Sequence, residues 1–286
     1  MDTALAVLAA MVATWFSIEL GRSYRSRPRF HAGVWAAALG MFAAACWGLA
    51  WGLGFGWGQA DFRAFYFLGA IANIPMLAAG SVALVMGEKT GRRFKDGVVV
   101  FAVLGAMVTL AAPISGTFPA DGVPEGSELF AFTIEMAGIT VPGPRVFAIV
   151  AGAVGTIIVV GLALVSAGRF RRTSRRLAAG NLLIAAGAIV PAFGGSLAAI
   201  GRGSGFALSL LVGVVMIYLG YRLATSGRRS AHPGEAALGL VGDDHPEQDQ
   251  RTSGDDADLE PLVEQDHAGQ QRDQRHDVPR QRRHGR

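Results

Sequence analysis

The sequence predicts an all-α fold: a polytopic membrane bundle of seven transmembrane helices. Hydrophobic residues make up 51% of the 286 residues and charged residues only 17%, and the mean hydropathy is +0.36. Soluble domains carry about 25% charged residues, so this composition argues against a water-soluble enzyme. The apolar residues are also gathered into runs of the length that spans a bilayer.

Seven apolar runs follow one another within the first 229 residues. At about 1.5 Å per residue, each run can cross a hydrocarbon core of about 30 Å. Backbone groups in lipid must be bonded within their own segment, so the runs form helices. The first run lacks the basic start of a signal peptide, and we expect it to be retained. The predicted spans are residues 4–20, 32–55, 64–87, 97–114, 146–167, 177–200 and 204–224.

Arginine and lysine are distributed unevenly between the connections that alternate along the chain. Basic segments resist translocation, so the side with more of them is the cytoplasmic side. Sixteen lie on one side and three on the other, which predicts the N-terminus outside and the C-terminus inside. The first set is Arg22, Arg25, Arg27, Arg29, Lys89, Arg92, Arg93, Lys95, Arg169, Arg171, Arg172, Arg175, Arg176, Arg222, Arg228 and Arg229; the second is Arg63, Arg145 and Arg202.

The net charge of +4 has the same topological explanation. We expect the basic inner loops to contact anionic lipid head groups of the bilayer. Lipid contact explains the positive charge better than DNA does, so we predict no nucleic-acid partner.

The runs also suggest an internal repeat. The fifth and sixth runs, with their Arg-rich connection, resemble the first and second, which predicts a three-plus-one-plus-three layout with the fourth helix as linker. Parallel repeats of this kind occur in sugar transporters of the SWEET class. The Pro-Gln signature of that class is absent, so the similarity concerns layout alone.

The segment 230–286 differs in composition from the rest. It is rich in Asp, Glu, Gln, His and Arg and poor in aliphatic and aromatic residues. Such a segment cannot bury enough apolar surface to offset its ordering entropy, which predicts a disordered cytoplasmic tail. Its histidines lack the spacing of metal ligands, so we predict no metal site there.

Ionisable residues in the middle of a membrane span usually mark function, because placing a charge there costs a few kcal/mol. The middles of the seven runs hold essentially none. Glu19 lies near the end of the first run, where a local ion pair with Arg22 is the simplest explanation. This pattern argues against ion-coupled transport.

Several cofactors are excluded by residue chemistry. The seventh run has no lysine for a retinal Schiff base, since the only lysines are Lys89 and Lys95 in a connection. A haem held by two histidines is excluded because His31 is the only histidine before the tail. Cys46 is the only cysteine, so no internal disulfide forms. Since hydrolase and phosphate-loop motifs are also absent, we predict a non-enzymatic protein without cofactor or metal.

Polar but uncharged residues accompany two prolines. In the third run Tyr66, Asn73 and Pro75 lie close together, and the sixth run holds Asn181 and Pro191. Proline frees a backbone carbonyl one turn back, and asparagine can bond across to another helix. One interpretation is a pair of hinges or a small polar ligand site. The other, which we favour from sequence, is interhelical bonding and packing.

Glycines in the sixth run predict close helix packing. Gly180, Gly187, Gly194 and Gly201 are seven residues apart and share one stripe, where a neighbouring backbone can approach. We predict that this helix is central and tightly packed.

Aromatic residues gather at the outer ends of the second and third runs. They form either an interfacial belt or a stacking platform at an outward-facing cavity. The residues are Trp47, Trp51, Trp57, Phe62 and Tyr66.

The outer connection 115–145 is the only long one. Long loops in compact folds are often lids or binding elements. We expect its apolar half, residues 129–134, to fold onto the mouth of the bundle. Glu128 and Glu135 would then meet Arg63, Arg145 or Arg202 in an outer polar cluster, the one arrangement that would favour a lipid-modifying enzyme.

The run Phe62–Pro75, FRAFYFLGAIANIP, together with the preceding Trp35 helix, resembles a group of uncharacterised actinobacterial seven-helix membrane proteins. The resemblance covers roughly residues 1–225 and implies topology, with no catalytic role. It marks Arg63, Tyr66, Asn73 and Pro75 as the first candidates for a ligand site or hinge.

Two functional hypotheses follow. The first is a non-enzymatic protein of the bacterial cytoplasmic membrane that binds a small or lipid-like ligand, or a partner membrane protein. The alternative is a transporter of an uncharged or amphipathic solute, moved between the two helix triplets.

Overall fold

The computed structural model describes residues 1–119, 122–136, 139–198 and 203–226. Within these ranges seven helices are long and apolar enough to cross a membrane. The all-α seven-helix bundle that the sequence predicts is therefore confirmed. The predicted disordered tail, Gly201 and Arg202 lie outside the described residues.

Six of the spans are single helices, and the third contains a break in its helical geometry. That third span consists of α3 (Gln59–Tyr66), a π-helix η1 (Phe67–Ala72) and α4 (Asn73–Met86). The others are α1 (Asp2–Ser26), α2 (Phe30–Phe55), α5 (Glu88–Ala111), α7 (Gly143–Phe170), α8 (Arg175–Ala198) and α9 (Gly203–Ser226).

The helices extend beyond the apolar runs at charged ends. α5 begins at Glu88, nine residues before the predicted span 97–114. Arg92 and Glu88 form an i,i+4 ion pair of 2.6 Å in its first turn, and the Arg92 guanidinium lies 4.6 Å from the centre of the Phe30 ring. Pairs of charged residues stabilise the part of a helix that extends into water. Hydropathy detects only the part in lipid and therefore underestimates the helix length.

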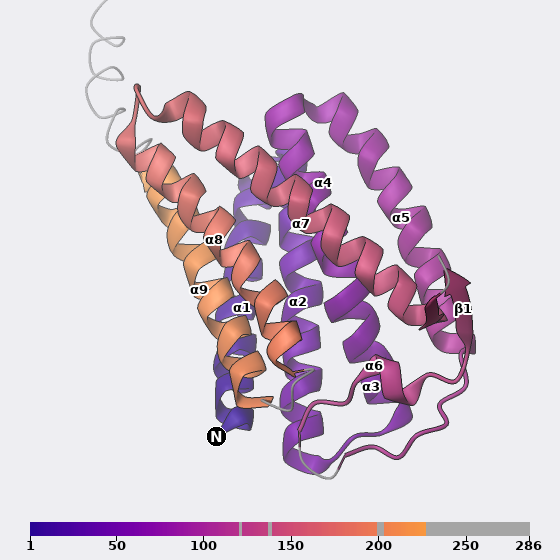
Figure 1. Cartoon of the computed structure of the whole chain (residues 1–286). Helices are drawn as coiled ribbons and strands as arrows, with labels where there is room; N and C mark the ends of the chain where they lie inside the picture. Colours follow the sequence, from indigo (N-terminus) through magenta and orange to yellow (C-terminus); the bar gives the residue numbers. More distant parts are fainter. Residues whose placement is uncertain (120–121, 137–138, 199–202, 227–286) are drawn as a thin grey trace, which may run out of the picture. The chain divides into compact units, whose positions relative to one another are not determined.

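Six helices form a ring in which each packs against the next. The order around the ring is α1, α2, α4, α7, α8 and α9, and α9 returns to α1 (Figure 1). α5 lies outside the ring, beside α4, and the apolar stretch of α5 has the smallest buried share of the seven spans. Within the described residues, α8 is a member of this ring and packs against α7 and α9, so the prediction that the sixth span is central is wrong.

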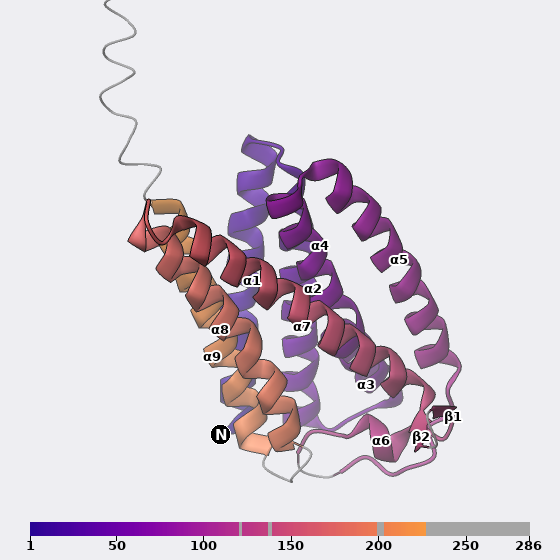
Figure 2. The same cartoon turned by 45° about the horizontal axis from the view of Figure 1, so that its top comes forward.

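The two ends of the helices differ in character. The short connections after α1, α4 and α7 carry the basic residues and meet at one end, here called the basic end (Figures 1 and 2). The N-terminus and the long connection between α5 and α7 lie at the other, the loop end (Figures 1 and 2).

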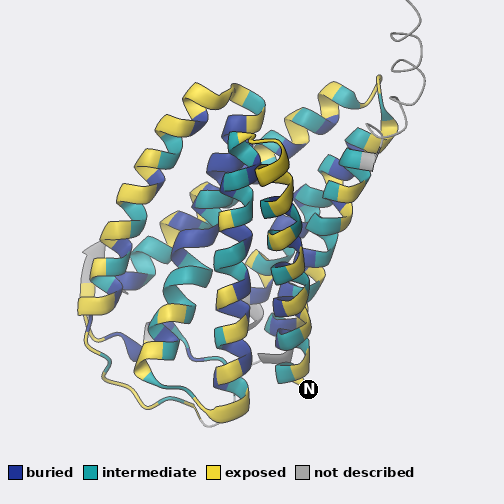
Figure 3. Cartoon of the chain, turned by 180° about the vertical axis from the view of Figure 1, so that it is seen from behind, coloured by how far each residue is buried: buried dark blue, intermediate teal, exposed yellow. Residues whose placement is uncertain are grey.

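Exposed residues occur along the helices and not only at their ends (Figure 3), and many of them are large apolar residues. On α5 alone, Val100, Met107 and Leu110 are each at least 61% exposed. A surface of this kind is unfavourable in water and suits the acyl chains of a bilayer. The chain is a multi-pass membrane protein.

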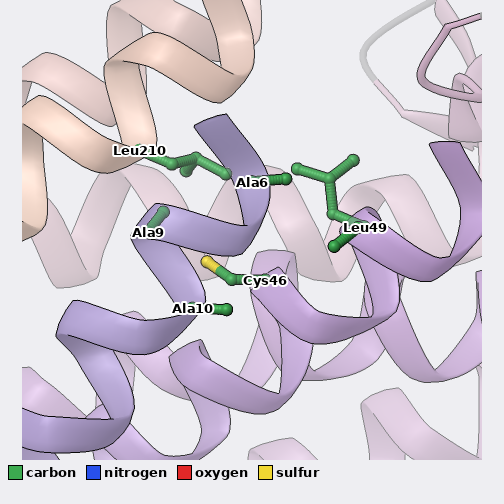
Figure 4. Packing of buried hydrophobic residues seen from close by; sticks show 7 residues of the cluster. Ala6, Ala9, Ala10, Cys46, Leu49 and Leu210 are labelled. Atoms are coloured by element: carbon green, nitrogen blue, oxygen red, sulfur yellow. The ribbon is translucent and has the colours of Figure 1, made fainter. Parts of the chain in front are cut away.

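Small residues let the helices of the ring approach closely. Ala6, Ala9 and Ala10 of α1 are fully buried against Leu49 of α2 and Leu210 of α9 (Figure 4). Without a hydrophobic driving force between helices in lipid, such close packing supplies the attraction.

The predicted glycine stripe of α8 packs against a matching stripe of α9. A Cβ on Gly187 would lie 2.8 Å from the carbonyl oxygen of Gly213, and one on Gly180 would lie 2.7 Å from that of Gly220. We call this contact the glycine seam. The tight packing predicted for the sixth span is thus confirmed, and it is directed at α9.

The connection between α5 and α7 has short regular elements. It contains α6 (Gly126–Leu129) and an antiparallel pair, β1 (Thr133–Met136) and β2 (Ile139–Pro142), which the sequence did not predict. Leu129 and Phe130 are buried against Phe62. The expectation that residues 129–134 fold onto the bundle is therefore confirmed for Leu129 and Phe130, whereas residues 131–133 are exposed.

Candidate functional site

The helix ring surrounds a cavity of about 630 Å³. Its wall comes from α2, the third span, α7, α8 and α9, and residues 123–126 of the long connection cover it at the loop end. Pockets for small molecules usually measure about 300–1,000 Å³ and are mostly apolar with a few polar groups. This cavity has both properties and is the candidate site.

One face of the third span forms a wall of the cavity. Tyr66, Gly69, Ala70, Asn73 and Leu77 all line it, at the three- and four-residue spacing of one helix face. The π-helix η1 lies within this face. Pro75 has no amide hydrogen to bond the carbonyl four residues back, and a π-turn is one way for a helix to accommodate such a loss.

Asn73 is the most buried polar side chain of the wall, with 5% of its surface exposed. Its Oδ1 atom accepts no hydrogen bond from any group in the described residues. An unsatisfied buried acceptor costs about 1–3 kcal/mol. The expected bond across to another helix is therefore not made by this atom, and the side chain that carries it lines the cavity.

The opposite wall is one face of α7. Arg145, Ala148, Ile149, Gly152 and Thr156 line the cavity from the loop end inward. Arg145 is half-buried, and its guanidinium lies near enough to the Tyr66 hydroxyl for the two groups to interact electrostatically.

The α7 wall closes against the third span at Gly155. A Cβ at Gly155 would lie 2.6 Å from Ile74 Cγ2 and 3.3 Å from the nitrogen of Pro75. The cavity lies beside the π-helix and extends past this crossing, since Thr156 of α7 and Leu77 of the third span also line it.

α8 and α9 complete the wall. Pro191 of α8 lines the cavity and packs on Gly213, where an added Cβ would lie 2.5 Å from its Cγ. Phe206, Leu210 and Ile217 contribute apolar side chains from α9. This side of the cavity carries no ionisable group among the lining residues, so its polar groups belong to the third span, α7 and the cover.

Residues Val123–Gly126 cover the cavity at the loop end. The cover is held by a hydrogen bond of 3.1 Å from Trp57 Nε1 to the carbonyl oxygen of Gly122. Gly126 lies against the Tyr66 ring, since a Cβ at this position would lie 2.5 Å from a ring carbon. Glu125 also lines the cavity, which brings a carboxylate to the same end as Arg145.

Two of the sequence candidates lie away from the cavity. Arg63 donates hydrogen bonds to the carbonyl oxygens of Thr109, Leu110 and Ala112, the last two at 2.9 and 2.8 Å, and so caps the end of α5. Asn181 donates to the Leu177 carbonyl oxygen of its own helix at 2.9 Å. The structure thus brings together Tyr66, Asn73, Arg145 and Pro191, with Pro75 directly behind the wall.

The expected outer polar cluster is not assembled from the residues whose side chains can be placed. Glu128 is exposed and forms no ion pair with Arg63 or Arg145 among the described residues. Arg145 turns into the cavity instead. Arg202 and the side chain of Glu135 lie outside the described part of the chain.

Some of the aromatic residues at the outer ends of the second and third spans fit an interfacial belt, and others lie at the cavity. Trp47 and Trp51 are 45% and 54% exposed, as an interfacial belt requires. Phe62 is fully buried and Tyr66 lines the cavity, so these two belong to its loop end.

Glu19 has a different partner from the one expected. It accepts a hydrogen bond of 3.0 Å from the Tyr218 hydroxyl and lies 3.7 Å from Arg222, both on α9. The suggested local pair with Arg22 is wrong, because α1 presents Glu19 to α9. This cluster joins two helices at the basic end, away from the cavity.

Comparison of the chain with protein-family models, with curated proteins and with solved structures gives no significant match. The residues of the cavity therefore have to be interpreted from their own chemistry. A mostly apolar space with a buried amide, a tyrosine hydroxyl, an arginine and a glutamate can bind and orient an amphipathic molecule.

Sequence reasoning missed Ala148, Gly152 and Thr156 as lining residues. Together with Arg145 they follow one helical stripe, and that spacing was available in the sequence. What the spacing does not show is whether the stripe meets another helix or a cavity.

Proposed function

We propose that the protein is a non-enzymatic ligand-binding protein of the bacterial cytoplasmic membrane, and that its ligand occupies the cavity inside the helix ring. The observation that carries the proposal is Asn73, a buried amide in the cavity wall whose Oδ1 has no partner in the described residues. A polar group of an occupant, either a donor or an acceptor, supplies the missing partner of this amide.

The Asn73 amide can serve either kind of ligand group. Rotation about the Cβ–Cγ bond exchanges the positions of Oδ1 and Nδ2, so the side chain can accept or donate a hydrogen bond. The surrounding lining is apolar, so the ligand is an uncharged or amphipathic molecule. Burial of its apolar surface supplies most of the affinity, at about 25 cal/mol per Å².

A transporter is the second candidate, and the position of the cavity favours it. The walls come from the first predicted triplet (α2 and the third span) and from the second (α7, α8 and α9). Alternating access commonly moves one repeat against the other around a site between them. The π-helix then supplies a natural place for bending.

The test is thermal unfolding of the full chain in detergent against a panel of lipids and uncharged metabolites. We expect one class of ligand to raise the melting temperature of the unchanged protein but not of Asn73→Leu. The matched control is Asn181→Leu, because Asn181 lies on another face, bonded to its own helix. A ligand that stabilises all three proteins equally would refute the role of Asn73.

Transport is separated from binding in sealed vesicles. Protein-dependent accumulation of the stabilising ligand would favour the transporter. Stabilisation without accumulation would favour a receptor or carrier that holds its ligand.

A further inference from the structure

Two residues that line the cavity also lie on the surface of the protein. Ile149 of α7 is 48% exposed, and Ala192 of α8 is exposed as well. Beside them, no atom lies within 4 Å of the place that a Cβ on Gly152 would take. α7 and α8 are joined at the basic end and diverge toward the loop end (Figures 1 and 2). The cavity therefore opens sideways between these helices, at the position we call the portal.

The portal lies within the membrane-spanning part of the chain. Ile149 is six residues from the start of α7, about 9 Å along the axis at about 1.5 Å per residue. The neighbouring outward-facing residues are apolar, with Val154 at 51% and Phe193 at 68% exposure. A molecule that passes through this opening comes from the acyl-chain region of the leaflet at the loop end.

The cavity changes in character along its length. Arg145 and Tyr66 lie near its loop end, and the Arg145 side chain is one turn from Ile149 on the same stripe. Leu77 and Ile217 lie toward the basic end, with Leu77 about 16 Å from Tyr66 along the third span. A ligand is therefore bound with its polar part near the membrane surface and its apolar part in the bundle.

We propose that the ligand is a phospholipid of the surrounding bilayer, which enters through the portal and places its phosphate beside Arg145 and Tyr66. The ester carbonyl groups of the lipid then lie beside Asn73 and accept a hydrogen bond from its Nδ2, and one acyl chain occupies the cavity beyond Asn73. The inference rests on the proposed function, because it names the ligand class of the same cavity.

Arginine is suited to this role because its planar guanidinium donates two parallel hydrogen bonds to phosphate oxygens. The Tyr66 hydroxyl adds a further donor. The cover supports entry from the bilayer over entry from water, since Pro124 and Gly126 are buried and the Trp57–Gly122 bond holds the segment in place.

The experiment compares two glycines of α7 at which an added side chain meets open space. Gly152 borders the portal, whereas Gly161 lies deeper on α7 and does not line the cavity; neither has an atom within 4 Å of an added Cβ. The full chain, Gly152→Trp and Gly161→Trp are reconstituted in vesicles of phosphatidylethanolamine and phosphatidylglycerol, extracted, and analysed by native mass spectrometry for retained phospholipid. Ala192→Trp is a second portal variant from the α8 side.

A single cysteine placed in the cavity wall provides an independent measure of the route. Cys46 is only 1% exposed and packs against α1, so all four proteins carry Cys46→Ser together with Ala148→Cys, because Ala148 lines the cavity. A dodecyl-maleimide dissolved in the same vesicles then reports access to the cavity from the bilayer. Labelling of this cysteine is followed by intact-protein mass spectrometry.

We expect the unchanged protein and Gly161→Trp to retain phospholipid and to be labelled at the same rate. Gly152→Trp and Ala192→Trp should lose the lipid and be labelled several-fold more slowly, with melting temperatures that show they are folded. Equal retention and equal labelling in all four proteins would overturn the portal and leave the binding function standing. Retention by none of them, combined with stabilisation by a water-soluble ligand, would overturn the phospholipid but not the ligand-binding function.

The head-group assignment has its own variant. Arg145→Gln should lower retention of phosphatidylglycerol several-fold and leave binding of the uncharged lipid diacylglycerol unchanged. An equal loss of both lipids, or of neither, would refute a phosphate site at Arg145.

Discussion

Glycine has opposite roles in the glycine seam and in the α7 wall of the cavity: it brings two helices together in the seam and leaves space in the wall. At the seam, Gly187 has the backbone of α9 so close that an added Cβ would lie 2.8 Å from a carbonyl oxygen. On the α7 wall, Gly152 meets nothing within 4 Å. Both lie on α-helices of the same ring and both touch the cavity lining. The difference shows that a glycine brings two helices into close contact only where a second helix lies directly against it.

This contrast has a mechanical consequence. α8 and α9 are joined backbone to backbone and present one rigid wall, to which α1 adds its alanines. The third span and α7 pack together at Gly155 and at Ala78 and Val159, and leave space beside Ala148 and Gly152. We infer that ligand entry deforms the α7 side of the ring more than the α8–α9 pair.

The largest effect is expected from breaking the seam. Gly187→Leu places a side chain against the α9 backbone, which cannot move aside as a flexible side chain can, and should cost about 3 kcal/mol. Gly152→Leu should leave stability nearly unchanged. Thermal unfolding in detergent measures both variants. Equal melting temperatures would contradict the distinction between a closed seam and an open wall.

The sequence predicted the number of spans, their approximate limits and the close packing of the α8 glycines, because hydropathy and residue size act locally along the chain. It could not place α8 in the ring. Gly213 and Gly220 of α9 have the same seven-residue spacing as Gly180 and Gly187 of α8. This match decides that α8 packs against α9, and it becomes visible only when the two helices are compared with each other.

The candidate site shows the same limit. Tyr66 and Asn73 were identifiable as polar residues beside a proline, and Arg145 as a lone basic residue at the loop end. Arg63 looked equally promising, yet it is used to cap α5. Arg63 is kept from the cavity by its bonds to the end of α5. This packing of α5 against α3 cannot be predicted from the sequence of either segment alone.

The next largest effect on stability should come from removing the Arg63 side chain that caps α5. Arg63→Ala leaves three carbonyl groups at the end of α5 without their charged donor, and hydrogen bonds to charged groups contribute about 1.5–3 kcal/mol. Because α5 lies outside the ring, we expect loss of stability without loss of ligand binding. Thermal unfolding with and without ligand measures the two separately. A variant with unchanged stability that no longer binds ligand would place Arg63 in the site after all.

A smaller effect is expected at the cover. Trp57→Phe keeps an aromatic ring but removes the hydrogen bond to Gly122, worth about 0.5–1.5 kcal/mol. Amide hydrogen exchange of residues 122–126 should become faster. Trp47→Phe is the control, since its indole donates to Thr14 Oγ1 at an exposed position. Unchanged exchange in Trp57→Phe would mean that the apolar contacts of Leu129 and Phe130 hold the cover alone.

Filling the cavity should have the smallest effect on stability and the clearest effect on ligand binding. Ala148 lines it, whereas Ala151, one turn along α7, is 2% exposed and does not. Ala151→Phe forces a ring into packed helices and should cost about 1–3 kcal/mol. Ala148→Phe places the same ring in open space, so it should keep or slightly raise stability while preventing ligand-dependent stabilisation. If Ala148→Phe instead destabilises the protein as much as Ala151→Phe does, the α7 wall is packed like the seam, and the contrast between the two regions disappears.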